Sequence, residues 1–287
     1  MPSLKYFRPK TLDEALTLLE QGVPLAGGTM LTPRRHRLDA VIDLQDLGMA
    51  ALERQGDALE VGAGCTLQQL IEADAFVSPA LTQACRGEAA WNLRNMATLG
   101  GTMVAATGRS PVAAALLALG AEVHGLPIDR WSTVEAFLGA RGADSGFRLL
   151  TRFRWPATTT LRFARVGRSP MDAPIVLVAL GRAADGALRV VLGGWGPCPV
   201  RVPDAEHALA SGDTSGAARA AAQAYATAGD AWASAEYRAE VASVLVRRLA
   251  AEEKIPGSAK DKSAGEGRDK AAGEAKGMVP REPRGTT

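Results

Sequence analysis

The chain has 287 residues, of which 47% are hydrophobic and 22% are charged, a composition typical of globular domains and unlike that of disordered or collagen-like chains. Its 33 basic and 31 acidic residues leave a formal net charge of +2, which excludes the strongly basic balance typical of nucleic-acid-binding proteins. This length suits one large domain or two ordinary ones.

The first 56 residues predict a small α/β unit. Thr11-Leu12-Asp13-Glu14 forms a capping box that opens a leucine-rich helix. A short strand at 23–25 leads into the glycine loop Ala26-Gly27-Gly28-Thr29, and residues 40–44 are typical of a buried strand.

A second unit is predicted over residues 57–157, and it repeats the order of strand, capping box and helix. An extended segment stops at Pro156, and the threonines that follow are typical of a connector. We therefore expect a domain boundary near 157–161. The predicted elements are a strand at 58–63, a helix from Thr66 to about Ala73, a helix from Ser78 through Trp91 toward Arg94, a glycine loop at 98–102, a helix at 112–119 and a strand at 122–124.

Residues 161–255 predict a smaller α+β domain. Beyond it, residues 256–287 contain no Leu, Ile, Phe, Tyr or Trp, so they cannot bury a core and predict a disordered tail. The predicted elements of the domain are strands at 175–180 and 187–192, a hairpin turn at Asp185-Gly186, and alanine-rich helices at 216–227 and 235–251.

The cysteines Cys65, Cys85 and Cys198 have no C-x-x-C spacing and no companion histidines, so the sequence predicts neither a zinc site nor an iron–sulfur cluster in this chain. An odd and sparse set of cysteines favours a reducing, cytoplasmic environment. The longest apolar stretch, at 112–119, is less than half a membrane span, and the first ten residues lack the apolar core of a secretory signal. We therefore expect a cytoplasmic protein without a membrane span or a metal of its own.

Two glycine-rich segments carry the candidate chemistry, one at 26–29 and one at 98–102. Paired glycines let backbone N–H groups approach a phosphate closely and form a concave nest, to which a threonine hydroxyl adds a donor. Two such segments would hold the two phosphates of a dinucleotide. The same Gly-Gly-Thr sequence is also typical of a tight turn without a ligand, and its spacing alone does not distinguish the two.

Better-known phosphate motifs are absent. Gly62-Ala63-Gly64-Cys65-Thr66-Leu67 begins like the dinucleotide fingerprint but has Leu67 where the third glycine allows helix packing. The chain has no G-x-x-x-x-G-K-[ST], which excludes the chemistry of P-loop NTPases. Its three histidines, at 36, 124 and 207, are far apart in the sequence and predict no site.

Several short motifs occur in a set order along residues 4–252, and each is weak alone. They are Phe7-Arg8-Pro9, Leu25-Ala26-Gly27-Gly28-Thr29-Met30-Leu31, Val41-Ile42-Asp43-Leu44, Val61-Gly62-Ala63-Gly64, Arg94-Asn95-Met96-Ala97-Thr98-Leu99-Gly100-Gly101, Leu116-Leu117-Ala118-Leu119-Gly120-Ala121, Leu192-Gly193-Gly194, Pro199-Val200-Arg201 and Ala235-Glu236-Tyr237-Arg238. Together they resemble the FAD-binding medium subunit of the molybdenum hydroxylases, the carbon monoxide dehydrogenase and xanthine dehydrogenase family.

This resemblance implies an α+β fold, in which a two-subdomain FAD-binding domain of the PCMH type at 1–157 (subdomains about 1–56 and 57–157) precedes the C-terminal domain and the tail. It implies that FAD is the cofactor, with its pyrophosphate held by backbone amides of both glycine segments and by the Thr98 hydroxyl, and it implies no catalytic acid or base. The implied cofactor-binding residues are Ala26, Gly27, Gly28, Thr29, Met30, Leu31, Thr98, Leu99, Gly100, Gly101, Thr102 and Leu150.

Three positions depart from the family pattern. Met30 stands where the family often has Asp, and Thr102 where it often has Asn. Pro111 stands where the family has an Asp that faces the polar chain of the cofactor, while Ser110 beside it retains a hydroxyl.

The implied function is electron transfer within a complex. The chain would receive electrons from [2Fe–2S] clusters on a small subunit, which a large molybdenum-cofactor subunit supplies, and pass them through FAD to an external acceptor. The complex would be a heterotrimer or its dimer, and neither its organic substrate nor its acceptor follows from this sequence.

Two other functions remain open at this point. One is a self-contained flavin reductase of related fold. The motif at 235–238 favours the subunit family over this reductase. The other is a scaffold subunit that has lost the flavin, which the residues at 102 and 111 would favour.

Overall fold

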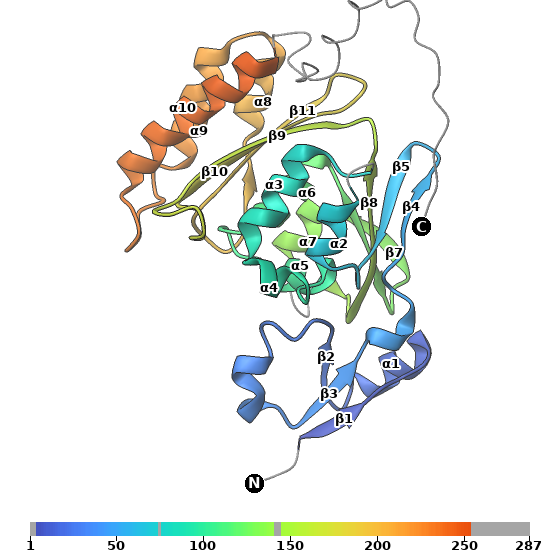
Figure 1. Ribbon diagram of the computed structural model, residues 1–287. Coiled ribbons are helices and arrows are strands. Elements are labelled where there is room, and N and C mark those ends of the chain that lie inside the picture. Colours follow the sequence, from blue (N-terminus) through green and yellow to red (C-terminus); the bar gives the residue numbers. More distant parts are fainter. Residues whose placement is uncertain (1–3, 74–75, 141–144, 254–287) are drawn as a thin grey trace, which may run out of the picture. The chain divides into compact units, whose positions relative to one another are not determined.

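The structure, a computed structural model, describes residues 4–73, 76–140 and 145–253 (Figure 1). The tail predicted at 256–287 lies outside these described residues. The described part of the chain forms three sheets with helices packed on them, which confirms the predicted α+β fold class. No helix in this part is both long enough and apolar enough to cross a membrane.

The first sheet is parallel, with the strand order β1-β3-β2. Its helix begins at Thr11, whose hydroxyl accepts a hydrogen bond from the Glu14 amide, as the capping sequence predicts. Ala15 of that helix and Ile42 of the central strand are fully buried in a small core. The elements are β1 (Lys5–Phe7), α1 (Leu12–Leu18), β2 (Val23–Leu25), the 3-10 helix η1 (Thr32–Arg37), β3 (Ala40–Asp43) and the 3-10 helix η2 (Gln45–Leu47).

The second sheet is antiparallel, with the strand order β4-β5-β8-β6-β7. All residues of its central helix, α6, are buried, because α6 is apolar on every side and packs against α3, the second sheet and the third sheet. The elements are β4 (Leu52–Gln55), β5 (Ala58–Gly62), α2 (Leu67–Glu72), α3 (Pro79–Glu88), α4 (Trp91–Arg94), α5 (Leu99–Ala105), α6 (Pro111–Leu119), β6 (Glu122–Leu126), β7 (Arg130–Thr133), α7 (Val134–Gly139) and β8 (Leu149–Pro156).

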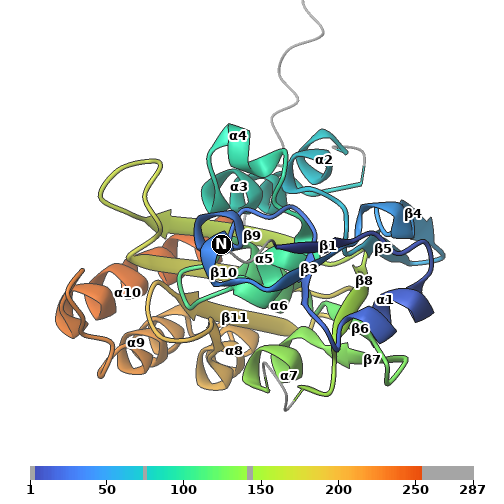
Figure 2. The same cartoon turned by 90° about the horizontal axis from the view of Figure 1, so that it is seen from below.

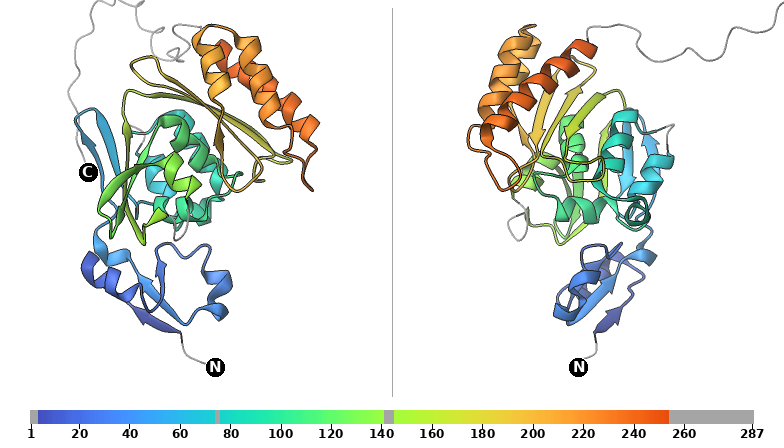
Figure 3. Two further views of the ribbon diagram at one scale, coloured as in Figure 1. Left: turned by 180° about the vertical axis from the view of Figure 1, so that it is seen from behind. Right: turned by 60° about the vertical axis from the view of Figure 1, so that its left-hand side comes forward.

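The third sheet is antiparallel, with the strand order β12-β11-β10-β9, and it is covered on both faces. Figures 2 and 3 show α8, α9 and α10 along one face and the central helices on the other. Along β10, Val176 and Val178 point into the helical layer, whereas Leu177 points toward α6. The elements are β9 (Thr160–Val166), β10 (Val176–Arg182), β11 (Leu188–Gly193), β12 (Val200–Arg201), α8 (Pro203–Ala210), α9 (Thr214–Ala224) and α10 (Ala235–Glu253).

Two predicted elements differ from the structure. The helix expected from Ser78 toward Arg94 ends at Glu88, because Ala89 and Ala90 adopt extended backbone before the short helix α4 begins. The glycine loop expected at 98–102 forms the first turn of α5, whose N-cap is Thr98.

The sequence interpretation also missed several elements, which are β1, β4, β7, α7, β9, β12 and α8. Strand β9 begins at Thr160, inside the segment interpreted as a connector, and its residues Leu161 and Phe163 alternate into the core.

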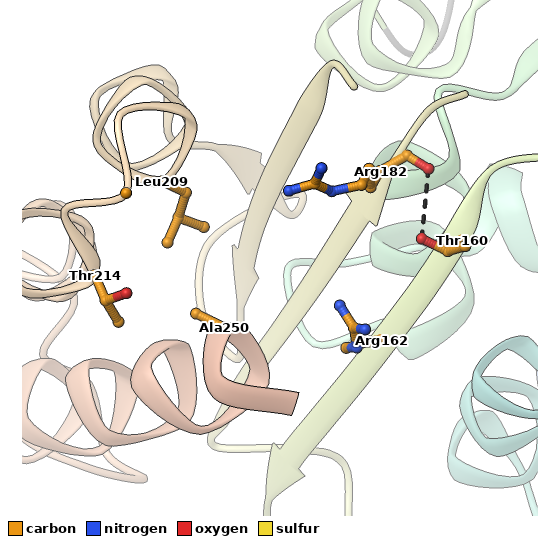
Figure 4. Close-up of a pocket in the computed structure, with 7 residues that line it drawn as sticks. Thr160, Arg162, Arg182, Leu209, Thr214 and Ala250 are labelled. Atoms are coloured by element: carbon orange, nitrogen blue, oxygen red, sulfur yellow. Dashed lines mark hydrogen bonds between the residues drawn. The ribbon is translucent and has the colours of Figure 1, made fainter. Parts of the chain in front are cut away.

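A cavity of about 340 Å³ lies between the third sheet and its helical layer (Figure 4). Thr160 Oγ1 donates to the carbonyl oxygen of Arg182 at 3.5 Å, and Arg162 Nη2 donates to the carbonyl oxygen of Glu252 at 3.2 Å. The cavity shares no residue with the glycine segments. Its lining residues are Thr160, Arg162, Arg182, Leu209, Gly212, Thr214 and Ala250.

Candidate functional site

The first glycine segment is a tight turn between β2 and η1. Gly28 has a positive φ of 68°, and its carbonyl oxygen accepts from the amides of Leu31 and Thr32 at 3.1 and 2.8 Å. A left-handed residue in such a turn is typical of anion-binding nests of backbone N–H groups. The amides of residues 27–30 donate no hydrogen bond to any residue that the structure describes, so they are available to an acceptor from outside.

The second glycine segment is engaged within the protein. The Leu99 amide donates to the carbonyl oxygen of Cys65 and the Gly100 amide to that of Ala63, each at 2.8 Å. The Gly101 amide donates to Thr98 Oγ1 at 3.2 Å. The amides of Leu99 and Gly100 therefore already have acceptors within the protein, whereas the amides of the first segment have none among the described residues.

The two segments meet at Gly27. A Cβ atom built on Gly27 would lie 1.6 Å from the carbonyl oxygen of Met96, which means that the backbone of the first segment packs directly on the backbone that leads into Thr98. A Cβ on Gly101 would meet only Thr98 Oγ1, at 3.0 Å. The open amides of the first segment, the Thr98 hydroxyl and the uncovered face of Gly101 thus belong to one region.

Thr151, which follows Leu150 in β8, is joined to the second segment through Ala63. The Ala63 amide donates to the carbonyl oxygen of Thr151 at 2.8 Å, and the Ala63 carbonyl oxygen accepts from Gly100. The pairing of β6 with β8 shifts register here, so that Thr151 has no partner in the ladder, and its Oγ1 lies 2.7 Å from His124 Nδ1. Leu150 itself is buried, with 7% of its surface exposed.

The predicted site residues therefore fall into two groups. Those with access to solvent are Ala26, Gly27, Gly28, Thr29, Met30, Leu31, Gly101 and Thr102. Those buried in the protein are Thr98, Leu99, Gly100 and Leu150.

The carboxylate of Glu88, the last residue of α3, lies at the start of α6. The sequence interpretation did not single out this residue. Its Oε2 accepts from Ser110 Oγ at 2.8 Å and from the Val112 amide at 2.9 Å. Ser110 Oγ also accepts from the Ala113 amide at 3.2 Å, so this hydroxyl caps the first turn of α6. The end of α3 thus places a carboxylate at the first turn of α6.

Replacing Glu88 with Gln is expected to flatten the pH dependence of stability. Desolvation raises the pKa of Glu88 from 4.5 to about 7. Because the folded protein then binds a proton that the unfolded chain has lost, stability from this group is present below pH 4.5 and is lost as pH rises through about 7. Glutamine retains an acceptor for Ser110 and Val112 without titrating.

The measurement is the melting temperature of both chains across this pH range. The wild-type value should fall relative to that of Glu88→Gln as pH rises. If the melting temperatures of the two chains change with pH in parallel, Glu88 does not have the raised pKa described above.

A contact between loops joins the third sheet to the segment before α6. The Gly194 amide donates to the carbonyl oxygen of Gly108 at 2.6 Å, and the Gly108 amide donates to that of Gly196 at 3.0 Å. Trp195 packs on Tyr225 with ring centroids 4.2 Å apart. The loop that follows β11 is thereby fixed against the segment that follows α5.

Two family models match the chain. The FAD binding domain in molybdopterin dehydrogenase matches residues 2–157, and the CO dehydrogenase flavoprotein C-terminal domain matches residues 162–252.

Among curated relatives, the uncharacterized protein YgfM of Escherichia coli (strain K12) is 30% identical over 263 residues, which cover 86% of this chain and 95% of that protein. The nicotine 6-hydroxylase medium subunit of Paenarthrobacter nicotinovorans is 27% identical over 281 residues, which cover 88% and 98%.

Solved structures agree with these matches. The reconstituted CO dehydrogenase from Oligotropha carboxidovorans superposes with a TM-score of 0.74 at 25% identity, covering 87% of this chain and 97% of that chain. Quinoline 2-oxidoreductase from Pseudomonas putida 86 superposes with a TM-score of 0.77 at 21% identity, covering 88% and 96%, and this second likeness concerns the fold.

Proposed function

Since this chain belongs to the family of FAD-binding medium subunits of the molybdenum hydroxylases, we propose that it passes electrons from iron–sulfur clusters of a partner subunit through FAD to an external acceptor. FAD is the cofactor of this family and its members are oxidoreductases. The chain itself is proposed to position the cofactor and not to act on the organic substrate.

The observation that carries the proposal is the set of open amides at residues 27–30, packed against the backbone before Thr98. Four donors without an acceptor in the described residues are a costly arrangement unless solvent or a ligand satisfies them. A pyrophosphate fits this donor set because it is anionic and offers several oxygens to a concave array of N–H groups.

The proposed roles of the site residues follow from their placement. The amides of residues 27–30 and the Thr98 hydroxyl would hold the pyrophosphate, and Gly101 would let it approach because its face is uncovered. Leu99 and Gly100 would fix this segment to the protein core. When bound, FAD supplies the redox chemistry, whereas the protein supplies position and electrostatics.

The comparisons favour a subunit over a self-contained reductase. The chain covers 98% of the nicotine 6-hydroxylase medium subunit and 97% of the matched CO dehydrogenase chain. We propose that the iron–sulfur clusters and the molybdenum cofactor are likewise held by partner chains, as a heterotrimer or its dimer, in the cytoplasm.

Co-expression tests this proposal. The chain should purify with one FAD per copy and should assemble with an iron–sulfur subunit and a molybdenum-cofactor subunit when the three are co-expressed. Dye reduction with an aldehyde, a purine or carbon monoxide should require all three chains. A chain that purifies without flavin, or that reduces the dye alone, would contradict the proposal.

A further inference from the structure

The 3-10 helix η1, residues 32–37, is a basic segment. It contains Arg34, Arg35, His36 and Arg37, and all of its residues are exposed. The sequence has no acidic residue between Glu20 and Asp39, so no carboxylate close in the chain neutralises these charges.

The tertiary structure does not neutralise them either. Within the described residues, the guanidinium groups of Arg34, Arg35 and Arg37 pair with no carboxylate, and the polar contact that Arg37 makes is from its Nε to His36 Nε2 at 3.3 Å. Other arginines of this protein are paired, as Arg152 is with Glu60 at 2.7 Å. Unpaired like charges so close together repel one another, so these three charges disfavour the folded state slightly and do not stabilise it through ion pairs.

The basic segment is anchored to the candidate site. Its first amide, that of Thr32, donates to the carbonyl oxygen of Gly28 at 2.8 Å, and Met30 and Met96 beside it are 52% and 53% exposed. Figure 1 shows the segment and α1 on opposite sides of the first sheet. Three positive charges are therefore held at the edge of the proposed flavin site, next to exposed apolar side chains.

We propose that the basic segment docks an acidic face of the iron–sulfur subunit and steers that subunit toward the flavin. This inference rests on the proposed function. A partner that reduces the flavin must approach it closely, because electron tunnelling slows steeply with distance. Uncompensated charge at the rim of an interface raises association rates by about 10- to 1,000-fold at low salt.

The geometry favours a protein surface over a small anion. The arginine residues of the segment are exposed, and none of them lines the cavity between the third sheet and its helical layer. A site for a small anion needs convergent donors in a concavity, whereas separate exposed charges beside apolar side chains are typical of the rim of a protein interface.

Charge reversal tests the inference. The variant Arg34→Glu/Arg35→Glu/Arg37→Glu is compared with Arg54→Glu/Arg219→Glu/Arg247→Glu, which makes the same change of net charge at exposed positions elsewhere. The measurement is the association rate of each flavin-loaded chain with the purified iron–sulfur subunit at low and high salt. We expect the first variant to associate at least about tenfold more slowly at low salt, with the difference shrinking as salt screens the charges.

The other outcomes are distinct. Equal association rates and equal salt dependence in both variants would overturn the docking role. Loss of flavin from the first variant alone would mean that the segment serves the cofactor, which also overturns it. If the wild-type chain binds flavin but binds no iron–sulfur subunit, the proposed function itself is wrong, whatever the role of the three arginines.

Discussion

Replacing Gly27 with valine is expected to remove most of the bound flavin while the chain stays folded. A Cβ at this position would lie 1.6 Å from the carbonyl oxygen of Met96 and 2.5 Å from its carbonyl carbon. Backbone atoms cannot rotate aside as a side chain would, so the first glycine segment must move away from the second. The open amides of residues 27–30 and the Thr98 hydroxyl would then no longer face a common acceptor.

We expect the dissociation constant for flavin to rise at least about tenfold, the effect of losing roughly 1.4 kcal/mol of binding free energy, so that flavin is lost during purification. The measurement is flavin absorbance relative to protein after purification, with circular dichroism to monitor folding. Gly139→Ala is the matched control, because nothing lies within 4 Å of a Cβ built there. A folded Gly27→Val chain with full flavin content would remove the proposed site.

Replacing Arg238 with methionine is expected to destabilise the fold strongly. The Arg238 side chain is fully buried, and its Nη2 donates to Asp230 Oδ1 at 2.6 Å while its Nη1 donates to the carbonyl oxygen of Gly194 at 3.3 Å. Methionine fills much of the volume but leaves both acceptors without this donor. Removing one partner of a buried ion pair costs about 3–5 kcal/mol.

Because the Asp230 side chain is 35% exposed, water can solvate it in part, and we expect about 3 kcal/mol, the lower end of that range. Urea unfolding measures this loss. Arg248→Met, on the same helix, is the control, because Arg248 is 71% exposed and its pair with Glu252 spans 3.4 Å. Similar unfolding midpoints for the two variants would show that the buried arginine does not hold the loop after β11.

Local features of the fold could be predicted from the sequence because they depend on neighbouring residues. Thr66 forms the expected capping box with Gln69, and Ser78 with Pro79 opens α3 as expected. The apolar run at 112–119 is a fully buried helix, since a helix without a polar face has to be covered on every side.

The contacts that build the candidate site could not be predicted, because they join residues far apart in the sequence. Nothing near Gly27 indicates that its backbone packs on Met96, and nothing near Gly100 indicates that its amide donates to Ala63. From the sequence, the two Gly-Gly-Thr segments look equivalent. In the described residues of the structure, only the first segment has amides without an acceptor.

Glu88 shows the same limitation. At the end of α3 it has the pattern of a solvated helix terminus, yet tertiary packing brings its carboxylate to the first turn of α6. Nothing close to Glu88 in the sequence indicates that its carboxylate accepts from Ser110 and Val112, which lie 22 and 24 positions further along the chain.

The central claim is that electrons reach the flavin from a partner subunit, and anaerobic flavin absorbance tests it most directly. Substrate, whether an aldehyde, a purine or carbon monoxide, is added to the flavin-loaded chain alone and to the chain assembled with its iron–sulfur and molybdenum-cofactor subunits. The flavin band should bleach in the assembled complex and stay unchanged in the lone chain. Bleaching of the lone chain at a catalytic rate would contradict the claim and identify a self-contained reductase.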